Sequence, residues 1–355
     1  MTVNLAMNVR RTFWPTRRFR PILSRRRLLA NLSGARTHLT LLGESYPVDS
    51  VTNITPSIVS KTFLRLHTQP SHPLSILRTL IEAHFPDYAH LSSLSPIVSP
   101  FKNFDELSFP KDHPGRSITD SYYINKDLML RTHTSAHEVE VFGRGETKWL
   151  LTADVYRRDE IDGSHYPVFH QMEGARLFSA DASGMKEVEE DNARLSRHLS
   201  RSDIIIEDIP NITPSNPCQI SHDPQHSELV AVNLKLALNN LILALFGGAS
   251  GASSTNPLRV RWIEAYFPFT SPSFEVEVFF RGKWLEILGS GVVRQATLDT
   301  ASLCPLSYLQ LKLTGPATLV ARRGPEQDRL GFWSRSRAHS YGSLLHPRHS
   351  TLLVD

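Results

Sequence analysis

One short stretch of the chain carries aromatic and polar side chains at a spacing that could form a binding surface. Successive side chains of an extended strand point to opposite faces. Phe169, Gln171 and Glu173 therefore share one face of a strand, whereas His170 and Met172 share the other. The first face combines an aromatic platform with two groups that form hydrogen bonds. The spacing predicts a strand with one ligand-binding face.

An arginine suited to phosphate binding precedes this strand. Arg157 and Asp159 share a face by the same count, and a polar loop at residues 162–165 turns the chain back over them. A guanidinium group can donate hydrogen bonds to two oxygens at once, which makes Arg157 suitable for binding an α-phosphate. An ordinary amphipathic hairpin with a charged loop would show the same residues. This pattern alone therefore leaves a structural and a nucleotide-binding interpretation open.

Four segments in a fixed order favour the nucleotide-binding interpretation. The sequence reads LRTHTSAHE from Leu130, the hairpin covers residues 155–178, RWIEAYFPFTSPS follows from Arg261, and WLEILGSG follows from Trp284. The hairpin resembles motif 2 of class II aminoacyl-tRNA synthetases. Residues 51–299 as a whole resemble the phenylalanyl branch of that family, most of all its single-chain mitochondrial members.

The resemblance implies a phenylalanine–tRNA ligase that uses ATP and Mg²⁺. In that reaction the phenylalanine carboxylate attacks the α-phosphate of ATP, and the adenylate is then transferred to the terminal ribose of tRNA-Phe. Catalysis would rest on positioning and on charge neutralisation. The resemblance makes Arg157 the catalytic residue at the α-phosphate, with Asp159 and His165 as further ATP contacts. Phe169 would stack on adenine.

For the amino acid, the resemblance implies that Gln171 and Glu173 hold the ammonium group, since both offer oxygens that accept hydrogen bonds. His133 and Ser135 are two residues apart, so on a strand both would face the polar end of the substrate. His133 and His137 are four apart, the spacing of a metal pair on a helix. On a strand, however, that spacing only places them on one face.

Two downstream segments complete the implied site. Phe267 and Phe269 would select the phenyl ring of the substrate through edge-to-face contacts, worth about 0.5–1.5 kcal/mol beyond burial. Packing in the core is the alternative for both rings. In the next segment Glu286 would help to hold Mg²⁺, and Gly289 and Gly291 would let the backbone approach the adenylate closely.

These residues need a scaffold, and the chain predicts an α+β domain: a class II synthetase-like catalytic domain over residues 44–301, with an antiparallel sheet flanked by helices. Apolar periodicity predicts helices at 74–85 and 229–246, and alternation predicts strands on either side of a turn at 281–283. Residues 184–228 are rich in charge, serine, asparagine and proline. They predict a surface insertion with one helix at 185–199.

Composition separates the start of the chain from its body. The 39 basic and 35 acidic residues give a net charge of +4, but nine arginines and no acidic residue lie within residues 1–43. The remainder, with 30 basic against 35 acidic residues, is mildly acidic. The arginine-rich start predicts a mitochondrial transit peptide and a matrix location, with a nucleic-acid-binding arm as the alternative.

The sequence gives no sign of a membrane span, a disulfide framework or a zinc site. The sequence contains no run of 18 apolar residues, so no membrane partner is expected. Two cysteines, Cys218 and Cys304, support neither a disulfide framework nor a zinc site. The resemblance implies a monomer.

From Ser302 onward the chain leaves the family pattern. The family continues into a glycine-rich strand and helix called motif 3 and then an anticodon-binding domain, whereas residues 302–355 end in a tail rich in serine, arginine and histidine. Reading the codons of residues 333–354 one base later permits Gly-Leu-Gly-Leu-Glu-Arg and the rest of a motif 3 pattern. We therefore expect a frame-shifted tail that replaces motif 3 and the anticodon-binding domain.

Three function classes remain open from the sequence. The first is the phenylalanine–tRNA ligase, and the second is a catalytically impaired truncated product or a non-catalytic binding protein of the same fold. The third is an adenylating ligase that uses no tRNA. Phe267 and Phe269, together with the HTSAHE segment, favour the first over the third. The tail alone favours the second.

Overall fold

The computed structural model describes residues 37–158, 166–301, 308–314, 320–323 and 328–331, and only the backbone of the last three ranges. The chain divides into two units, Met1–Thr37 and His38–Asp355, and the description below concerns the second. Its first element is a hairpin that begins at His38, and Leu41 in that hairpin is fully buried. The predicted end of the transit peptide at residue 43 lies within this hairpin, and it stays a prediction.

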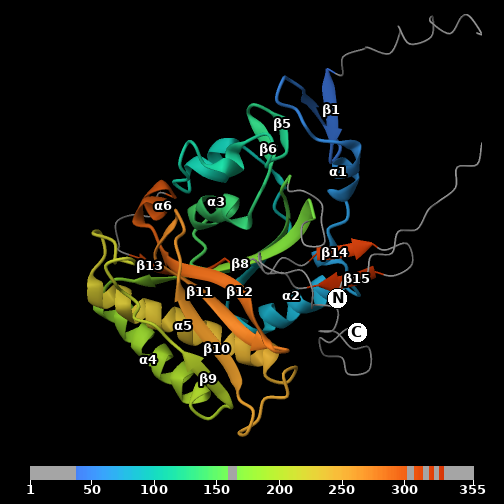
Figure 1. Cartoon of the computed structure of the whole chain (residues 1–355). Helices are drawn as coiled ribbons and strands as arrows, with labels where there is room; N and C mark the ends of the chain where they lie inside the picture. The colour runs from blue at the N-terminus through green and yellow to red at the C-terminus, as the bar shows by residue number, and fades with distance from the viewer. Residues whose placement is uncertain (1–36, 159–165, 302–307, 315–319, 324–327, 332–355) are drawn as a thin grey trace, which may run out of the picture. The chain divides into compact units, whose positions relative to one another are not determined.

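An eight-stranded sheet in the order β3-β7-β8-β13-β12-β11-β10-β9 forms the centre of this unit (Figure 1). Neighbouring strands run antiparallel except for the pairs β3–β7 and β9–β10 near the two edges. The predicted α+β class with a mainly antiparallel sheet is confirmed. The strands are β3 (Ala89–Leu91), β7 (Lys148–Tyr156), β8 (Val168–Ser179), β9 (Ile204–Glu207), β10 (Leu258–Glu264), β11 (Thr270–Phe280), β12 (Lys283–Val293) and β13 (Tyr308–Thr314).

Helices cover both faces of the sheet. Figure 1 shows α4 and α5 side by side across one face, and apolar side chains of α2, α4 and α5 form a single core cluster with that face. Helices α3 and α6 pack on the opposite face, against β7 and β8. The helices are α1 (Pro56–Lys61), α2 (Pro73–His84), α3 (Glu138–Gly143), α4 (Ala182–Leu199), α5 (Pro224–Phe246) and α6 (Gln295–Thr300).

Helix α5 is the central helix of the core. It starts at Pro224 because the carboxylate of Asp223 accepts hydrogen bonds from the first free backbone N–H groups of the helix. Val230, Leu234 and Leu238 are fully buried against the sheet. In the described part of the chain this is the one helix whose length and apolar composition would suffice to cross a membrane, and most of its apolar stretch is buried inside the protein.

Smaller elements surround the sheet. A three-stranded sheet in the order β4-β6-β5 and the hairpin β1–β2 share an apolar cluster with α1. The remaining elements are β1 (His38–Leu41), β2 (Glu44–Pro47), β4 (Ile97–Val98), β5 (Tyr123–Asn125), β6 (Leu128–Leu130), β14 (Val320–Arg323), β15 (Asp328–Gly331), three short 3-10 helices (Leu66–Thr68, Pro114–Arg116 and Thr134–His137) and a π-helical turn (Phe101–Asp105).

Residues 184–228, predicted to form a surface insertion, contain both buried and exposed parts. Most of α4, the whole of β9 and the start of α5 lie in this range, and Val188 of α4 is fully buried in the main core. Strand β9 extends the sheet by parallel pairing with β10. The helix predicted at 185–199 is present as α4, and the charged residues of this segment come from its other faces, which are exposed to solvent.

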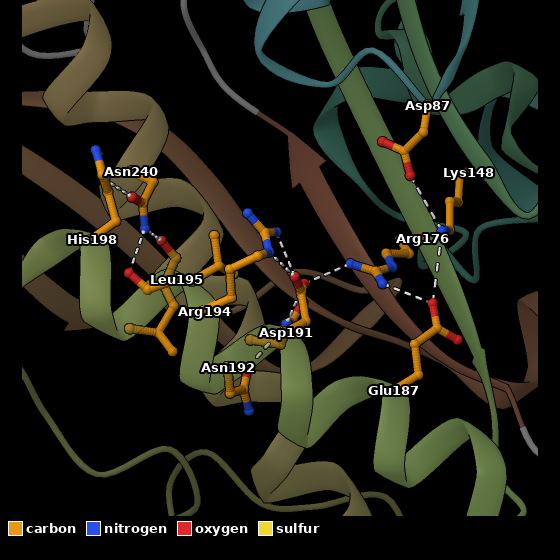
Figure 2. A network of polar contacts seen from close by, with 12 residues as sticks. Asp87, Lys148, Arg176, Glu187, Asp191, Asn192, Arg194, Leu195, His198 and Asn240 are labelled. Atoms are coloured by element: carbon orange, nitrogen blue, oxygen red, sulfur yellow. Dashed lines mark hydrogen bonds and ion pairs between the residues drawn. The ribbon is translucent and has the colours of Figure 1, made fainter.

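Polar contacts also hold α4 to the sheet. Figure 2 shows Arg176 of β8 between two acidic side chains of α4, with 2.8 Å from the guanidinium to Glu187 and 2.8 Å to Asp191. On the far side of the helix, the imidazole of His198 contacts the side-chain amide of Asn240 on α5. These contacts tie α4 to β8 and to α5.

The alternation of β7 and β8 defines two faces that matter for the site. Leu150 and Phe178 point to the α2–α4–α5 side, which we call the rear face. Trp149 and Ala175 point to the α3–α6 side, which we call the front face. By the same alternation Gln171 lies on the front face, and so do its neighbours two residues away along β8.

Candidate active site

Gln171 and Glu173 meet a short 3-10 helix on the front face. The hydroxyl groups of Thr134 and Ser135 donate to Glu173 Oε2 at 2.7 and 2.9 Å, and the backbone N–H of Thr134 donates to Gln171 Oε1 at 3.3 Å. Glu173 is 1% exposed. The structure thus brings together Gln171 and Glu173, predicted for the substrate ammonium group, and Ser135, predicted for the polar end of the substrate. It adds Thr134, which the sequence did not single out.

His133 and Ser135 do not lie on the strand that the sequence predicted. His133 is the residue before the 3-10 helix Thr134–His137, and Ser135 lies within that helix. A helical turn, and not the alternation of a strand, therefore sets the relative positions of these two residues. The ring of His137 contacts Arg131 at 3.0 Å and Glu140 at 3.1 Å. Burial lowers the pKa of His137, which favours its neutral form.

A row of aromatic rings lies beside these polar groups. Phe267 and Phe269 are stacked, with 5.9 Å between ring centroids and 9° between planes. Phe269 contacts Phe109 at 5.9 Å, and Phe109 in turn stacks on His133 at 5.4 Å and 11°. The row therefore connects the predicted selectivity residues with His133. Phe109 was missed because it is far from both in the sequence and belongs to no pattern.

Arg157 and Phe169 are in contact at the end of the hairpin. The guanidinium carbon of Arg157 lies 5.1 Å from the centroid of the Phe169 ring, a cation–π contact, and its Nε donates to the carbonyl oxygen of Thr132 at 3.0 Å. Phe169 is only 4% exposed. A planar group that stacked on this same face of the ring would take the place of the Arg157 guanidinium.

The chain from Arg131 to Ser135 is anchored from behind. The buried Arg131 forms an ion pair with Asp154 and donates to the carbonyl oxygens of Leu94 and Ser95 at 2.9 and 3.0 Å. Burial would raise the pKa of Asp154, but Arg131 and the Tyr156 hydroxyl hold it below its ordinary value. This pair fixes one end of the segment that carries the site.

A buried asparagine fixes the next residue of the same segment. The Asn103 amide accepts from the Thr132 backbone N–H at 3.0 Å and donates to the Thr132 hydroxyl at 2.8 Å, and Asn103 is fully buried. Thr132 then holds Arg157 through its carbonyl oxygen. Asn103 lies on the π-helical turn, a feature that often occurs at functional sites.

The rear side of β8 carries a different set of groups. His170 lies 5.1 Å from His67 between ring centroids, and burial lowers the pKa of His170 to about 3 and that of His67 to about 4. Both rings line an apolar cavity with Thr152 and Met172, between the sheet and helices α2 and α5. Both histidines are therefore neutral at physiological pH.

Strand β12 brings the last predicted residues to the front face. Glu286 pairs with Glu277 across β11 and β12, and Gly289 pairs with Glu275. At Gly291 an added Cβ would lie 2.5 Å from the carbonyl oxygen of Pro272, so packing against β11 already requires a glycine there. The prediction that Gly291 serves approach to the adenylate thus has a packing alternative.

The residues on this face fit a phosphate-bound Mg²⁺ better than a complete metal site. In the part of the chain that the structure describes, no three histidine, cysteine or acidic side chains gather closely enough to hold an ion. Mg²⁺ is usually bound by one or two carboxylates together with substrate phosphates, and Glu286 can supply one of them. Asp159 and His165, predicted to contact ATP, lie outside the described residues.

Comparison with known proteins shows the family to which this chain belongs. A family model described as the tRNA synthetases class II core domain (F) matches residues 59–185 and 219–307. The phenylalanine–tRNA ligase, mitochondrial, of Rattus norvegicus is 42% identical over 275 residues, which cover 74% of this chain and 53% of that protein. The protein of the same name from Saccharomyces cerevisiae is 39% identical over 298 residues, which cover 76% and 64%.

The chain spans between about half and two thirds of the length of these relatives. Most of α4 and the whole of β9 lie in the interval that the family model leaves unmatched. The two matched stretches contain the front-face residues of β8 and β12 and the 3-10 helix beside them. The chain belongs to the family of class II tRNA synthetase core domains.

Proposed function

We propose that this protein is a phenylalanine–tRNA ligase that activates phenylalanine with ATP and transfers it to mitochondrial tRNA-Phe. One arrangement supports the proposal above all. The carboxylate of Glu173, held by two hydroxyl groups, lies on the same front face as the row of rings that ends in Phe267 and Phe269. An ammonium acceptor beside an aromatic pocket suits an aromatic amino acid.

In this proposal Gln171 and Glu173 hold the ammonium group of phenylalanine, and His133 and Ser135 border its polar end. Phe267 and Phe269 form the wall against the phenyl ring. A wall of phenyl rings provides no hydrogen-bond partner, so a buried tyrosine hydroxyl would remain unpaired and tyrosine would be disfavoured.

On the ATP side, Arg157 turns from Phe169 to the α-phosphate and neutralises the charge that develops there. Phe169 then stacks on adenine. Asp159 and His165 contact ATP from the loop, and Glu286 with ATP phosphates holds Mg²⁺, which supplies charge neutralisation when bound. Gly289 and Gly291 form the floor beneath the adenylate.

The relatives and the composition support the remaining assignments. Mitochondrial proteins are among the relatives, and residues 1–43 have the composition of a transit peptide, so we propose the mitochondrial matrix as the location. We propose a monomer, although a relative from Prochlorococcus marinus, 28% identical, is named an alpha subunit. Sedimentation of the purified chain tests this assignment.

We further propose that residues 302–355 carry a frame-shifted tail in place of motif 3. Strand β13 pairs with β8 as far as Glu173 and with β12 as far as Gly289. Beyond these residues no described strand lies between β8 and β12, and the apolar cavity opens beside Met172 and Leu288. A strand followed by a helix, as motif 3 supplies in this family, would fill that space.

Exchange of pyrophosphate into ATP tests the proposed activation. The protein used has its reading frame moved by one base after Phe332. A second version also lacks Ser302–Phe332, the stretch outside the family pattern that precedes the shifted codons. Exchange that requires phenylalanine and is weak with tyrosine is expected. Exchange stimulated equally by both amino acids would rule out the proposed pocket.

A further inference from the structure

Thr134 contacts both proposed ammonium ligands at once. Its hydroxyl lies 2.7 Å from Glu173 Oε2, and its backbone N–H lies 3.3 Å from Gln171 Oε1. Thr134 is 2% exposed, so water does not compete for these contacts. In the described part of the chain, two hydroxyl groups donate to this carboxylate, those of Thr134 and Ser135.

The chemistry of these contacts sets the orientation of both acceptors. A backbone N–H can only donate, so it requires the oxygen of the Gln171 side chain, and not its nitrogen, to face the 3-10 helix. An ionised carboxylate can only accept, so the Thr134 hydroxyl must donate to Glu173. Thr134 is also β-branched, which restricts the rotation of its side chain. One residue thereby aligns an amide oxygen and a carboxylate.

We propose that Thr134 is a positioning residue for recognition of the substrate α-ammonium group. The proposal rests on the proposed function and deepens it. Without the Thr134 hydroxyl the Glu173 carboxylate loses one of the two hydroxyl donors that align its Oε2 atom, the other being Ser135. Binding of an ammonium group must then restore the lost alignment, and this cost reduces affinity.

The test measures binding to the full 355-residue chain by calorimetry, with three ligands. These are phenylalanine, 3-phenylpropionate, which lacks only the amino group, and ATP. We expect Thr134→Val, which keeps the shape of the side chain, to weaken phenylalanine binding roughly tenfold. Binding of 3-phenylpropionate and ATP should change by less than about twofold.

Thr134→Ser serves as the matched control, and Ser135→Ala tests the coupling between the two hydroxyl donors. Thr134→Ser keeps the hydroxyl and should restore phenylalanine affinity to within about threefold of the parent. Ser135→Ala removes the other donor to the same oxygen, and we expect its effect to exceed additivity when combined with Thr134→Val, since the two share one acceptor. The ¹³C resonance of the Glu173 carboxylate should shift in Thr134→Val and return in Thr134→Ser.

The outcomes distinguish a failure of the Thr134 proposal from a failure of the proposed function. Phenylalanine affinity unchanged in Thr134→Val, or an equal loss for 3-phenylpropionate, would overturn the positioning role while the proposed function stands. A parent chain that binds ATP and 3-phenylpropionate but gains nothing from the amino group would overturn both. Selective loss for phenylalanine with recovery in Thr134→Ser supports both.

Discussion

Replacing Glu173 with glutamine removes the charge that the proposed site offers to the substrate ammonium group. The change keeps size and shape, so Thr134 and Ser135 can still donate to the remaining oxygen at their present 2.7 and 2.9 Å. What is lost is the charge of the acceptor. A hydrogen bond to a charged group contributes about 1.5–3 kcal/mol and a neutral one about 0.5–1.5 kcal/mol.

The difference predicts a loss of about 1–1.5 kcal/mol in phenylalanine binding, or roughly a 5- to 13-fold rise in the KM for phenylalanine. Solvent screening does not reduce this value much because Glu173 is 1% exposed. Pyrophosphate exchange by the version whose reading frame is moved by one base after Phe332 measures the KM for each substrate. The KM for ATP should stay within about twofold. Equal rises for both substrates would show that Glu173 supports the fold of the site instead of the ammonium group.

Three further changes test other parts of the site. Arg157→Ala should lower the exchange rate about 10²- to 10³-fold, as loss of one transition-state donor does, with an unchanged circular dichroism spectrum; exchange within a few-fold of the parent would mean that Arg157 only packs on Phe169. Phe269→Ala should admit para-substituted phenylalanines into the cavity it leaves, and continued rejection with phenylalanine activation intact would place the pocket elsewhere. Because burial lowers the pKa of His170 to about 3 and of His67 to about 4, the unfolded chain binds more protons below pH 6.5. The free energy of unfolding should therefore fall as pH drops from 6.5 toward 4, by up to about 1.4 kcal/mol per pH unit for each histidine, and His170→Phe should make urea denaturation less sensitive to pH in that range.

Local periodicity made much of the fold predictable. Helix α2 lies within one residue of its predicted range at both ends, and the hairpin of β7 and β8 has Gln171 and Glu173 on one face as alternation required. Helix α5 starts five residues before its predicted range because a capping aspartate and a proline precede the apolar run. A prediction from apolar spacing alone does not include such a polar first turn.

The supporting residues of the site could not be found in this way. Asn103 and Thr132 form hydrogen bonds although they are 29 residues apart in the sequence. The ring of Phe109 contacts those of His133 and Phe269, and no spacing pattern in the sequence predicts these contacts. The two-residue spacing of His133 and Ser135 suits a strand as well as the short 3-10 helix that the structure has. Contacts between segments that are distant in the sequence determine which structure forms, and a single sequence does not reveal those contacts.

Charging of mitochondrial tRNA-Phe by the chain in its two reading frames tests the central claim most directly. The 355-residue chain should show little or no aminoacylation with phenylalanine. The version shifted by one base after Phe332, with Ser302–Phe332 removed if required, should aminoacylate tRNA-Phe and lose this activity with Glu173→Gln or Arg157→Ala. Robust charging by the unshifted chain, or none by either shifted version when both are folded, would contradict the account.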